Sequence, residues 1–159
     1  MALHIRMGTP ADENVAVAFN AAMAAETEGK TLHEPTLRAG VRAALADPAK
    51  GFYLMAERDG EVVGQLMVTT EWSDWRNGWY WWIQSVYVTP AARQAGVFRA
   101  LFDHLKGKAL ADPTVIGLRL YVEHDNERAR RVYAALGLSA EPYQLMGVYP
   151  LPGKESAFQ

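Results

Sequence analysis

The hydrophobic residues of this 159-residue chain change their spacing twice, and this change restricts the fold more than any other feature. They recur at helical intervals up to about residue 47 and then fall in short β-type runs from 52 to 88. From residue 97 onward, helical and β-type segments alternate. Hairpin strands followed by a β-α-β crossover predict an α/β fold with a mixed sheet, in which the crossover makes two strands parallel.

Turn signals set the limits of the expected elements. Asp59-Gly60 is a strong hairpin signal, because both positions of such a turn need positive φ. Gly137 is expected to end the last helix. The expected order is strand, helix, helix, three strands, helix, strand, helix, strand: His4–Met7, a helix through Val15 to Met23, one from about Pro35 to Asp47, Phe52–Glu57, Val62–Thr70, Trp79–Val88, a helix through Phe98 to Ala109, Val115–Val122, a helix through Ala129 to Leu136, and a strand within Gln144–Tyr149.

Length and composition favour a single domain over residues 1–159, because the chain is half hydrophobic but short for two cores. A net charge of −2 argues against nucleic acid as a partner. The chain has no cysteine, which excludes disulfides, thiolate metal sites and a cysteine nucleophile. The four histidines lack metal-ligand spacing, so no metal is expected. No apolar stretch suits a signal peptide or a bilayer span, so we expect a cytoplasmic protein without a membrane partner.

The stretch from Val88 to Arg99 joins the end of a strand to the start of a helix. A helix N-terminus presents unpaired N–H groups and partial positive charge, so a diphosphate can bind there. Gly96 would let the backbone approach phosphate closely, and Arg93 and Arg99 can add charge-assisted hydrogen bonds. Taken alone, the pattern is more typical of an ordinary turn with solvated arginines.

Two motifs together resemble the GCN5-related N-acetyltransferase (GNAT) family. The first is Val88-Thr89-Pro90 followed by Arg93, Gly96 and Phe98, and the second comprises Asn126, Ala129, Tyr133, Gly137 and Leu138. In the family, the first motif grips the pyrophosphate of coenzyme A. Phe98 departs from the pattern, because the family usually has a second small residue there. Its ring either limits the approach of phosphate or points into the core.

The resemblance implies transfer of an acetyl group from acetyl-CoA to an amine of a small-molecule or amino-acid-like acceptor, without a covalent enzyme intermediate. Tyr133 matches the family's proton donor to the thiolate, although its spacing also fits a packed aromatic residue. Asn126 also suits a helix N-cap. The residues implied to bind the coenzyme are Val86, Tyr87, Val88, Arg93, Gln94, Ala95, Gly96, Val97, Phe98, Arg99 and Asn126.

The acceptor side is less determined by the sequence. The substrate ammonium group must lose a proton to a carboxylate or a water chain before it attacks. Glu71 is the first candidate, because its strand borders the expected acceptor groove. The alternatives are Glu26, which is also a candidate substrate contact, Asp74 and Glu123. Carboxylates of this kind are more often solvated surface groups than catalytic bases.

All five tryptophans lie between Glu71 and Gln84. One interpretation places them on the core face of a hairpin and at a subunit contact, which allows a homodimer. The other makes Trp72, Trp75 and Trp81 walls of the acceptor pocket, where indole faces can hold a cationic amine.

The alternative to an enzyme is a noncatalytic acyl-CoA-binding or sensing domain. Tyr133 argues against this alternative, because it matches the family's proton donor.

Overall fold

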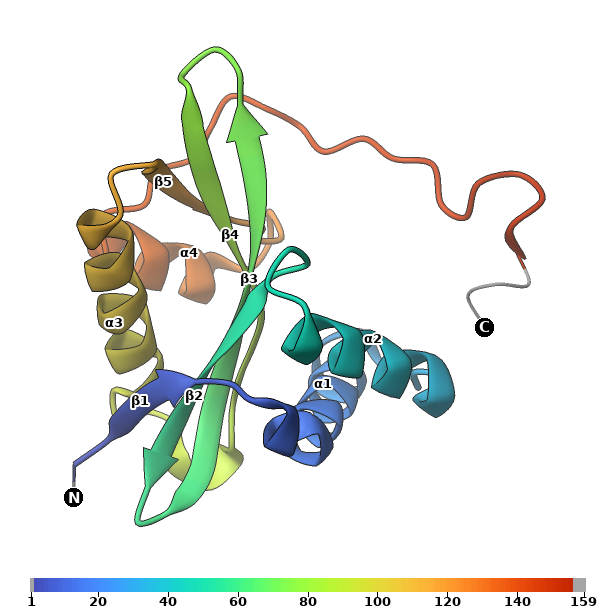
Figure 1. Cartoon of the computed structure of the whole chain (residues 1–159), viewed down its shortest axis with the longest axis vertical. Helices are drawn as coiled ribbons and strands as arrows, with labels where there is room; N and C mark the ends of the chain where they lie inside the picture. Colours follow the sequence, from blue (N-terminus) through green and yellow to red (C-terminus); the bar gives the residue numbers. More distant parts are fainter. Residues whose placement is uncertain (1, 156–159) are drawn as a thin grey trace.

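A five-stranded mixed sheet forms the centre of the computed structural model, which describes residues 2–155 (Figure 1). Its strands, in order across the sheet, are β1 (His4–Met7), β2 (Phe52–Arg58), β3 (Glu61–Ser73), β4 (Gly78–Val88) and β5 (Val115–Leu120). The first three neighbouring pairs are antiparallel, whereas β4 and β5 are parallel. The expected parallel crossover is therefore confirmed.

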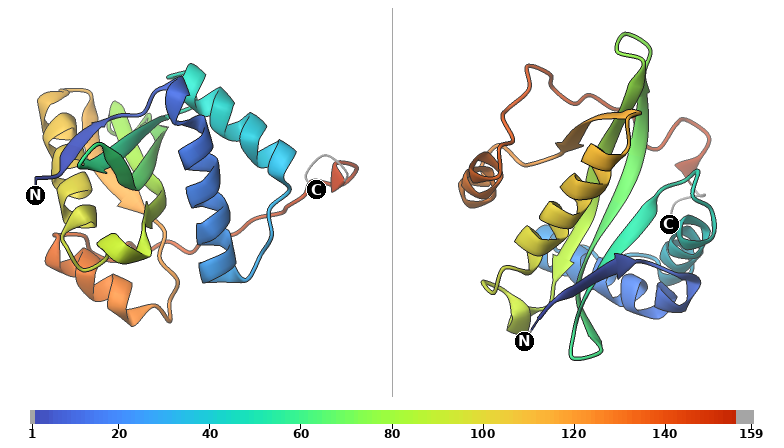
Figure 2. Two further views of the ribbon diagram at one scale, coloured as in Figure 1. Left: turned by 90° about the horizontal axis from the view of Figure 1, so that it is seen from below. Right: turned by 60° about the vertical axis from the view of Figure 1, so that its left-hand side comes forward.

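Helices cover both faces of this sheet (Figure 2). The first pair, α1 (Glu13–Glu28) and α2 (Glu34–Ala46), lies on one face, and α3 (Val97–Ala111) and α4 (Glu127–Ala135) lie on the other. Each face has its own hydrophobic cluster. Consecutive residues of β2 alternate between them, with Leu54 facing α3 and Met55 facing α1 and α2, and both are fully buried.

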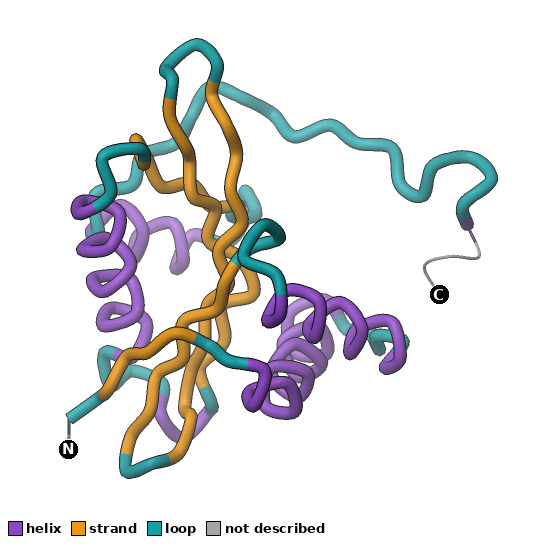
Figure 3. The backbone as a smooth tube through the Cα atoms, viewed as in Figure 1, coloured by secondary structure: helices purple, strands orange, loops and turns teal. Residues whose placement is uncertain are grey.

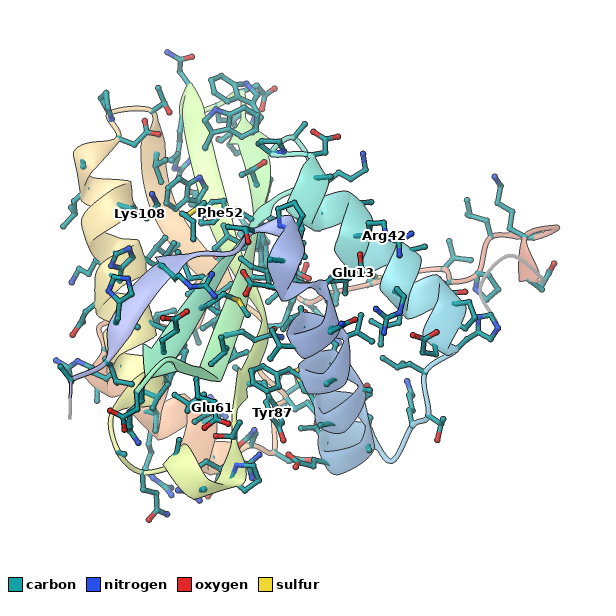
Figure 4. All side chains as sticks on the ribbon, turned by 60° about the horizontal axis from the view of Figure 1, so that its bottom comes forward. Glu13, Arg42, Phe52, Glu61, Tyr87 and Lys108 are labelled. Atoms are coloured by element: carbon teal, nitrogen blue, oxygen red, sulfur yellow. The ribbon has the colours of Figure 1, made fainter. Side chains whose placement is uncertain are left out.

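Ion pairs fasten α2 to α1. Arg42 Nε lies 2.7 Å from Glu13 Oε1, and Arg38 Nη1 lies 2.9 Å from Glu13 Oε2 (Figure 4). Hydrogen bonds from Arg42 and Arg38 lower the pKa of Glu13 to about 2, so this carboxylate stays ionised at neutral pH.

The local turn predictions are confirmed. Asp59 and Gly60 have φ values of 55° and 78°, as the two-residue hairpin turn between β2 and β3 requires. Gly137, with φ of 95°, follows the end of α4 in the left-handed conformation.

The expected last strand, within Gln144–Tyr149, was wrong. Residues 139–155, which we call the C-terminal arm, contain no strand in the described structure. A strand forms only beside another strand that takes up its backbone hydrogen bonds. The arm does not return to β5; it runs past the hairpin of β3 and β4 and continues away from the sheet (Figures 1 and 3).

Candidate active site

A β-bulge in β4 ends its pairing with β5. The two strands pair from Trp79, opposite Val115, to Ile83, opposite Leu120, and the described structure contains no pairing between β5 and residues 84–88. On the other side of β4, Ser85 and Val86 share a single partner position on β3, between the pairs Met67–Gln84 and Gln65–Tyr87. No strand of residues 2–155 therefore takes up the β5-facing edge of residues 84–88, where the Val88 carbonyl already accepts a hydrogen bond from Arg93 and the remaining backbone groups can bind a ligand.

Gln65 of β3 fixes this bulge from behind. Its side chain is fully buried, and Nε2 donates hydrogen bonds to the Ser85 carbonyl (3.0 Å) and to Asn20 Oδ1 (3.1 Å). Ser85 has a φ of 52°, a conformation that non-glycine residues seldom adopt without support. Asn20 lies on α1, so a helix on the opposite face also supports the bulge.

A pocket of about 300 Å³ lies beside the bulge, where the two sequence motifs meet. Val86, Phe98, Asn126 and Tyr133 were all expected at the site, and they come from three segments of the chain. The pocket is lined by Val86, Phe98, Asn126, Arg128, Ala129, Val132 and Tyr133.

Tyr133 projects into this pocket from α4 and is half-buried. Its ring packs edge-on against Phe98, with 5.9 Å between the ring centroids. Burial raises the pKa of Tyr133 above its ordinary value of 10, so its hydroxyl keeps its proton at neutral pH. Nearby, Asn126 Oδ1 accepts a hydrogen bond from the Ala129 amide (3.1 Å), which confirms the predicted helix cap.

The start of α3 has the form of an anion-binding site. Gly96 is exposed and left-handed, with φ of 79°, and open space surrounds the position where a Cβ would lie. The amide of Ala100 donates the first hydrogen bond of the helix, to the Gly96 carbonyl (3.0 Å). The amides of Val97, Phe98 and Arg99 come before it, in the turn where a helix leaves its N–H groups without intrahelical partners. The side chain of Val97 is buried and anchors this turn to the core.

The two arginines of the loop are bound to other residues of the chain. Arg93 Nη2 lies 2.7 Å from Glu26 Oε2, and Arg93 Nε donates to the Val88 carbonyl (2.9 Å). Glu26 Oε1 also accepts a hydrogen bond from the hydroxyl of Tyr87, whose buried ring lies between the sheet and α1 (Figure 4). Arg99 pairs with Asp103 (3.3 Å). Glu26 therefore lies beside the loop that leads to α3, in contact with Arg93 and Tyr87.

A second pocket, of about 610 Å³, lies beside the hairpin of β3 and β4. Arg119 of β5 is its central charge: Nη1 lies 3.2 Å from Glu71 Oε1, and Nε lies 3.0 Å from Glu141 Oε2. The Arg119 guanidinium also lies 3.6 Å from the centroid of the Tyr80 ring. The lining comprises Glu71, Trp72, Ser73, Asp74, Trp75, Arg76, Tyr80, Trp82, Arg119, Glu141, Pro142 and Tyr143.

The tryptophans lie on different faces of the hairpin. Trp81 is buried in the cluster under α3 and packs edge-on against Phe52 (5.3 Å), so it is not among the pocket's lining residues. Trp72 and Trp75 do line the pocket, and Trp75 is 86% exposed at the hairpin tip. Trp82 lines it as well and donates its indole N–H to Glu71 Oε1 (2.7 Å).

A family model for the acetyltransferase (GNAT) family matches residues 18–138, a range that contains both motifs and the sheet from β2 to β5. The chain belongs to this family. The resemblance drawn from the two motifs is thus confirmed, and so is the mixed α/β fold class.

Relatives of this GNAT chain include a mycothiol acetyltransferase of Streptomyces griseus, 39% identical over 104 residues. That match covers 63% of the chain but only 30% of the length of the relative. A crystal structure described as a possible acetyltransferase from Clostridium difficile 630 is 39% identical, with a TM-score of 0.89, covering 95% of this chain and 99% of that one. A predicted acetyltransferase from Clostridium acetobutylicum, determined with acetyl-CoA, shares the fold at 17% identity (TM-score 0.75, covering 92% and 96%).

Sequence reasoning about this GNAT chain missed Tyr80, Trp82, Arg119 and Glu141. Tyr80 and Trp82 alternate with Trp81 and face the opposite side of the sheet, so the two-residue period of a strand would have identified them. Arg119 and Glu141 carried no comparable signal, because strand pairing and the course of the arm bring them to the pocket.

The remaining carboxylate candidates divide between the pocket and the surface. Asp74 lines the larger pocket. Glu123 and its neighbour His124 are exposed in the connection between β5 and α4. Within residues 2–155, no cluster of three potential metal ligands is present, and no helix is both long and apolar enough to cross a bilayer.

Proposed function

We propose that this chain transfers an acetyl group from acetyl-CoA directly to the primary amine of a small-molecule or amino-acid-like acceptor. Membership of the GNAT family supports acetyl transfer, and the absence of cysteine in the sequence fits a reaction without a thioester on the protein. The proposed reaction uses no metal and takes place in the cytoplasm.

The observation that carries this proposal is the convergence of three features around residues 84–88. The unpaired edge of β4 can hydrogen-bond the amide groups of an extended pantetheine arm, as a neighbouring strand would. The start of α3, with Gly96, offers amides to the diphosphate. Tyr133 lines the same pocket as Val86 and Phe98, with its hydroxyl protonated.

These positions suggest how the residues share the reaction. The amine nitrogen bonds to the thioester carbon, and the resulting oxyanion is stabilised by a backbone N–H of β4 near Val86 or Val88. The carbon–sulfur bond then breaks, and Tyr133 donates its proton to the departing thiolate. The nitrogen releases its remaining excess proton to solvent, and solvent reprotonates Tyr133. The products are an amide and free coenzyme A. Asn126 caps α4 and is proposed to present its amide NH₂ to the coenzyme.

Glu71 remains the proposed acceptor of the amine's proton. Both of its hydrogen bonds, from Trp82 and Arg119, end on Oε1, and Oε2 is the atom that we propose takes the proton. The same carboxylate, with Asp74 and the faces of Trp72 and Trp75, would attract an ammonium group into the pocket. Glu26 is assigned instead to orienting Arg93 of the coenzyme loop.

A thiol-release assay tests the function. Purified protein is incubated with acetyl-CoA and a panel of primary amines and amino acids, and free coenzyme A is measured by a thiol reagent. We expect release that depends on at least one amine and a matching acetylated product by mass spectrometry. Tight binding of acetyl-CoA without amine-dependent release across the panel would favour the noncatalytic alternative.

Replacing Trp75 by Ala is expected to raise the acceptor KM roughly three- to tenfold, because one exposed cation–π contact contributes about 0.5–1 kcal/mol and some apolar contact is lost too. Trp75 lies at the hairpin tip, so folding should change little. Leu110→Ala is the control, since Leu110 is a 78% exposed apolar residue on α3 and is not in the pocket lining. Steady-state kinetics gives the acceptor KM, and titration gives the coenzyme affinity. If both variants, or neither, changed the acceptor KM, the pocket assignment would be wrong.

A further inference from the structure

Gln65 is a fully buried polar side chain whose two terminal atoms differ in their hydrogen bonding. It lies opposite Met55 of β2, in the layer that packs under α1. Both hydrogens of Nε2 are used, on the Ser85 carbonyl and on Asn20 Oδ1, whereas Oε1 has no hydrogen-bond partner within residues 2–155. A buried carbonyl without a partner costs stability. What this amide contributes therefore comes from its two N–H donors.

The amide of Gln65 has one favourable orientation. If it were turned over, Oε1 would face the Ser85 carbonyl, and neither oxygen has a hydrogen to donate. Asn20, the second acceptor, is held in turn by a hydrogen bond from its Nδ2 to the Tyr53 hydroxyl (3.3 Å). Tyr53 is itself buried in the core. The hydrogen bond to the Ser85 carbonyl is therefore anchored on both α1 and β2.

The Ser85 carbonyl points out of the sheet. Carbonyls of a regular strand point sideways, to the neighbouring strands, but this one accepts from a side chain that is anchored to α1, on one face of the sheet. With a φ of 52°, Ser85 departs from the strand conformation, which allows this rotation. The peptide bond between Ser85 and Val86 is planar and trans, so the Val86 N–H points in the opposite direction. That direction leads to the face covered by α3 and α4 (Figure 2), where Val86 also lines the smaller pocket.

Val86 is also a residue of β4 whose N–H is available to a ligand. It has no pairing partner on β3 or β5 in the described structure, because the bulge places it between two registered pairs. Val88, the other N–H considered for the oxyanion, lies opposite Gly64 of β3. The smaller pocket therefore brings together the Val86 N–H and the protonated hydroxyl of Tyr133.

We propose that Gln65, held by Asn20, is a positioning residue for the reaction: through the Ser85 carbonyl it aims the Val86 N–H at the thioester carbonyl. An N–H that is already aimed needs no reorganisation when negative charge develops on the carbonyl oxygen, and this is where such donors contribute most. Gln65 acts only through Ser85, from behind the sheet. The inference rests on the proposed acetyl transfer and assigns its oxyanion to one N–H.

Kinetics of Gln65→Met tests the role, because Met keeps the length of the side chain and removes both N–H donors. We expect kcat to fall roughly tenfold or more, short of the roughly 10²–10³-fold cost of deleting an oxyanion donor, and the affinity for acetyl-CoA to fall by a smaller factor. Tyr53→Phe is the matched control: it removes another hydrogen bond of the same buried network, leaves the bond from Gln65 to Ser85 in place and should keep kcat. Equal losses of kcat in both variants, or a loss of affinity alone in Gln65→Met, would show that Gln65 is only structural.

Infrared spectroscopy tests the aim of the N–H without any acceptor. Acetyl-CoA is isotope-labelled in its thioester carbonyl and bound to the protein. Its stretching frequency should be lower on the wild type and Tyr53→Phe than on Gln65→Met, because a hydrogen bond weakens the carbonyl double bond. If Gln65→Met does not fold, Asn20→Ala, which frees Gln65 from α1, should raise the frequency instead.

The two measurements separate this inference from the proposed function. Equal carbonyl frequencies on the wild type and on the folded variant overturn the positioning role, whatever the enzyme acetylates. A lower frequency on the wild type, without amine-dependent turnover, would support the positioning of the Val86 N–H and count against the transfer to amines.

Discussion

Replacing Tyr133 by Phe is expected to lower kcat by roughly 10²-fold or more, the usual scale for a positioned proton donor. Phe keeps the edge-on packing against Phe98 and removes only the hydroxyl, so coenzyme affinity and melting temperature should change little. The measurement is steady-state kinetics together with calorimetric titration of coenzyme A. Tyr121→Phe, in an exposed residue outside the smaller pocket, is the matched control and should leave kcat unchanged.

The pH dependence gives an independent test of the same role. A proton donor works only while it is protonated, and burial raises the pKa of Tyr133 above 10. The loss of activity that reports this group should therefore lie above pH 10 in the wild type and be missing from Tyr133→Phe. If kcat of that variant equals the wild-type value where chemistry limits turnover, solvent protonates the thiolate and Tyr133 is only a packed aromatic residue.

Replacing Gly96 by Asp is expected to weaken coenzyme A binding by roughly 10²-fold. A carboxylate at this position would stand in front of the amides that begin α3, and like charges about 4 Å apart repel by about 4 kcal/mol at an effective dielectric of 20, less in salt. The open space around Gly96 means that the new side chain meets no steric obstacle.

Gly96→Asn is the control that isolates the charge. Asn and Asp have nearly the same shape, and both tolerate the left-handed conformation better than other side chains, so backbone strain should be similar in the two variants. Calorimetric titration should give much weaker binding for Asp than for Asn, and raising the salt concentration should narrow the gap. Equal affinities in two folded variants would place the diphosphate away from the start of α3.

The residues proposed to hold the coenzyme were expected to lie together because they are local in the sequence. Only a few residues separate the end of β4 from Gly96 and the start of α3. Tyr133 lies in α4, and Gly137 follows the end of the same helix. Turn chemistry and helix termini are set by neighbouring residues, so a pattern in the sequence suffices. The same holds for Asp59 and Gly60, whose positive φ values were expected from residue type alone.

The acceptor side was less accessible, because it depends on pairing between distant strands. The register of the sheet brings Glu71 of β3 to Arg119 of β5, and the course of the C-terminal arm brings Glu141 to the same arginine. The error about the last strand has a related cause. Residues 144–149 have the composition of a strand, but a strand also needs a neighbour, and composition does not say whether one is available.

The support of Ser85 by Gln65 and Asn20 has a consequence for how tightly a coenzyme can be held. The side chains of Gln65 on β3 and Asn20 on α1 hold the backbone of β4 that borders the opening. Their hydrogen bonds form when the protein folds. A ligand that enters it has no interstrand hydrogen bonds to break and no backbone to reshape, so little of its interaction energy is consumed by reorganisation. If the coenzyme binds at β4 as proposed, its affinity is expected to depend in part on Gln65 and Asn20, which lie behind the proposed site.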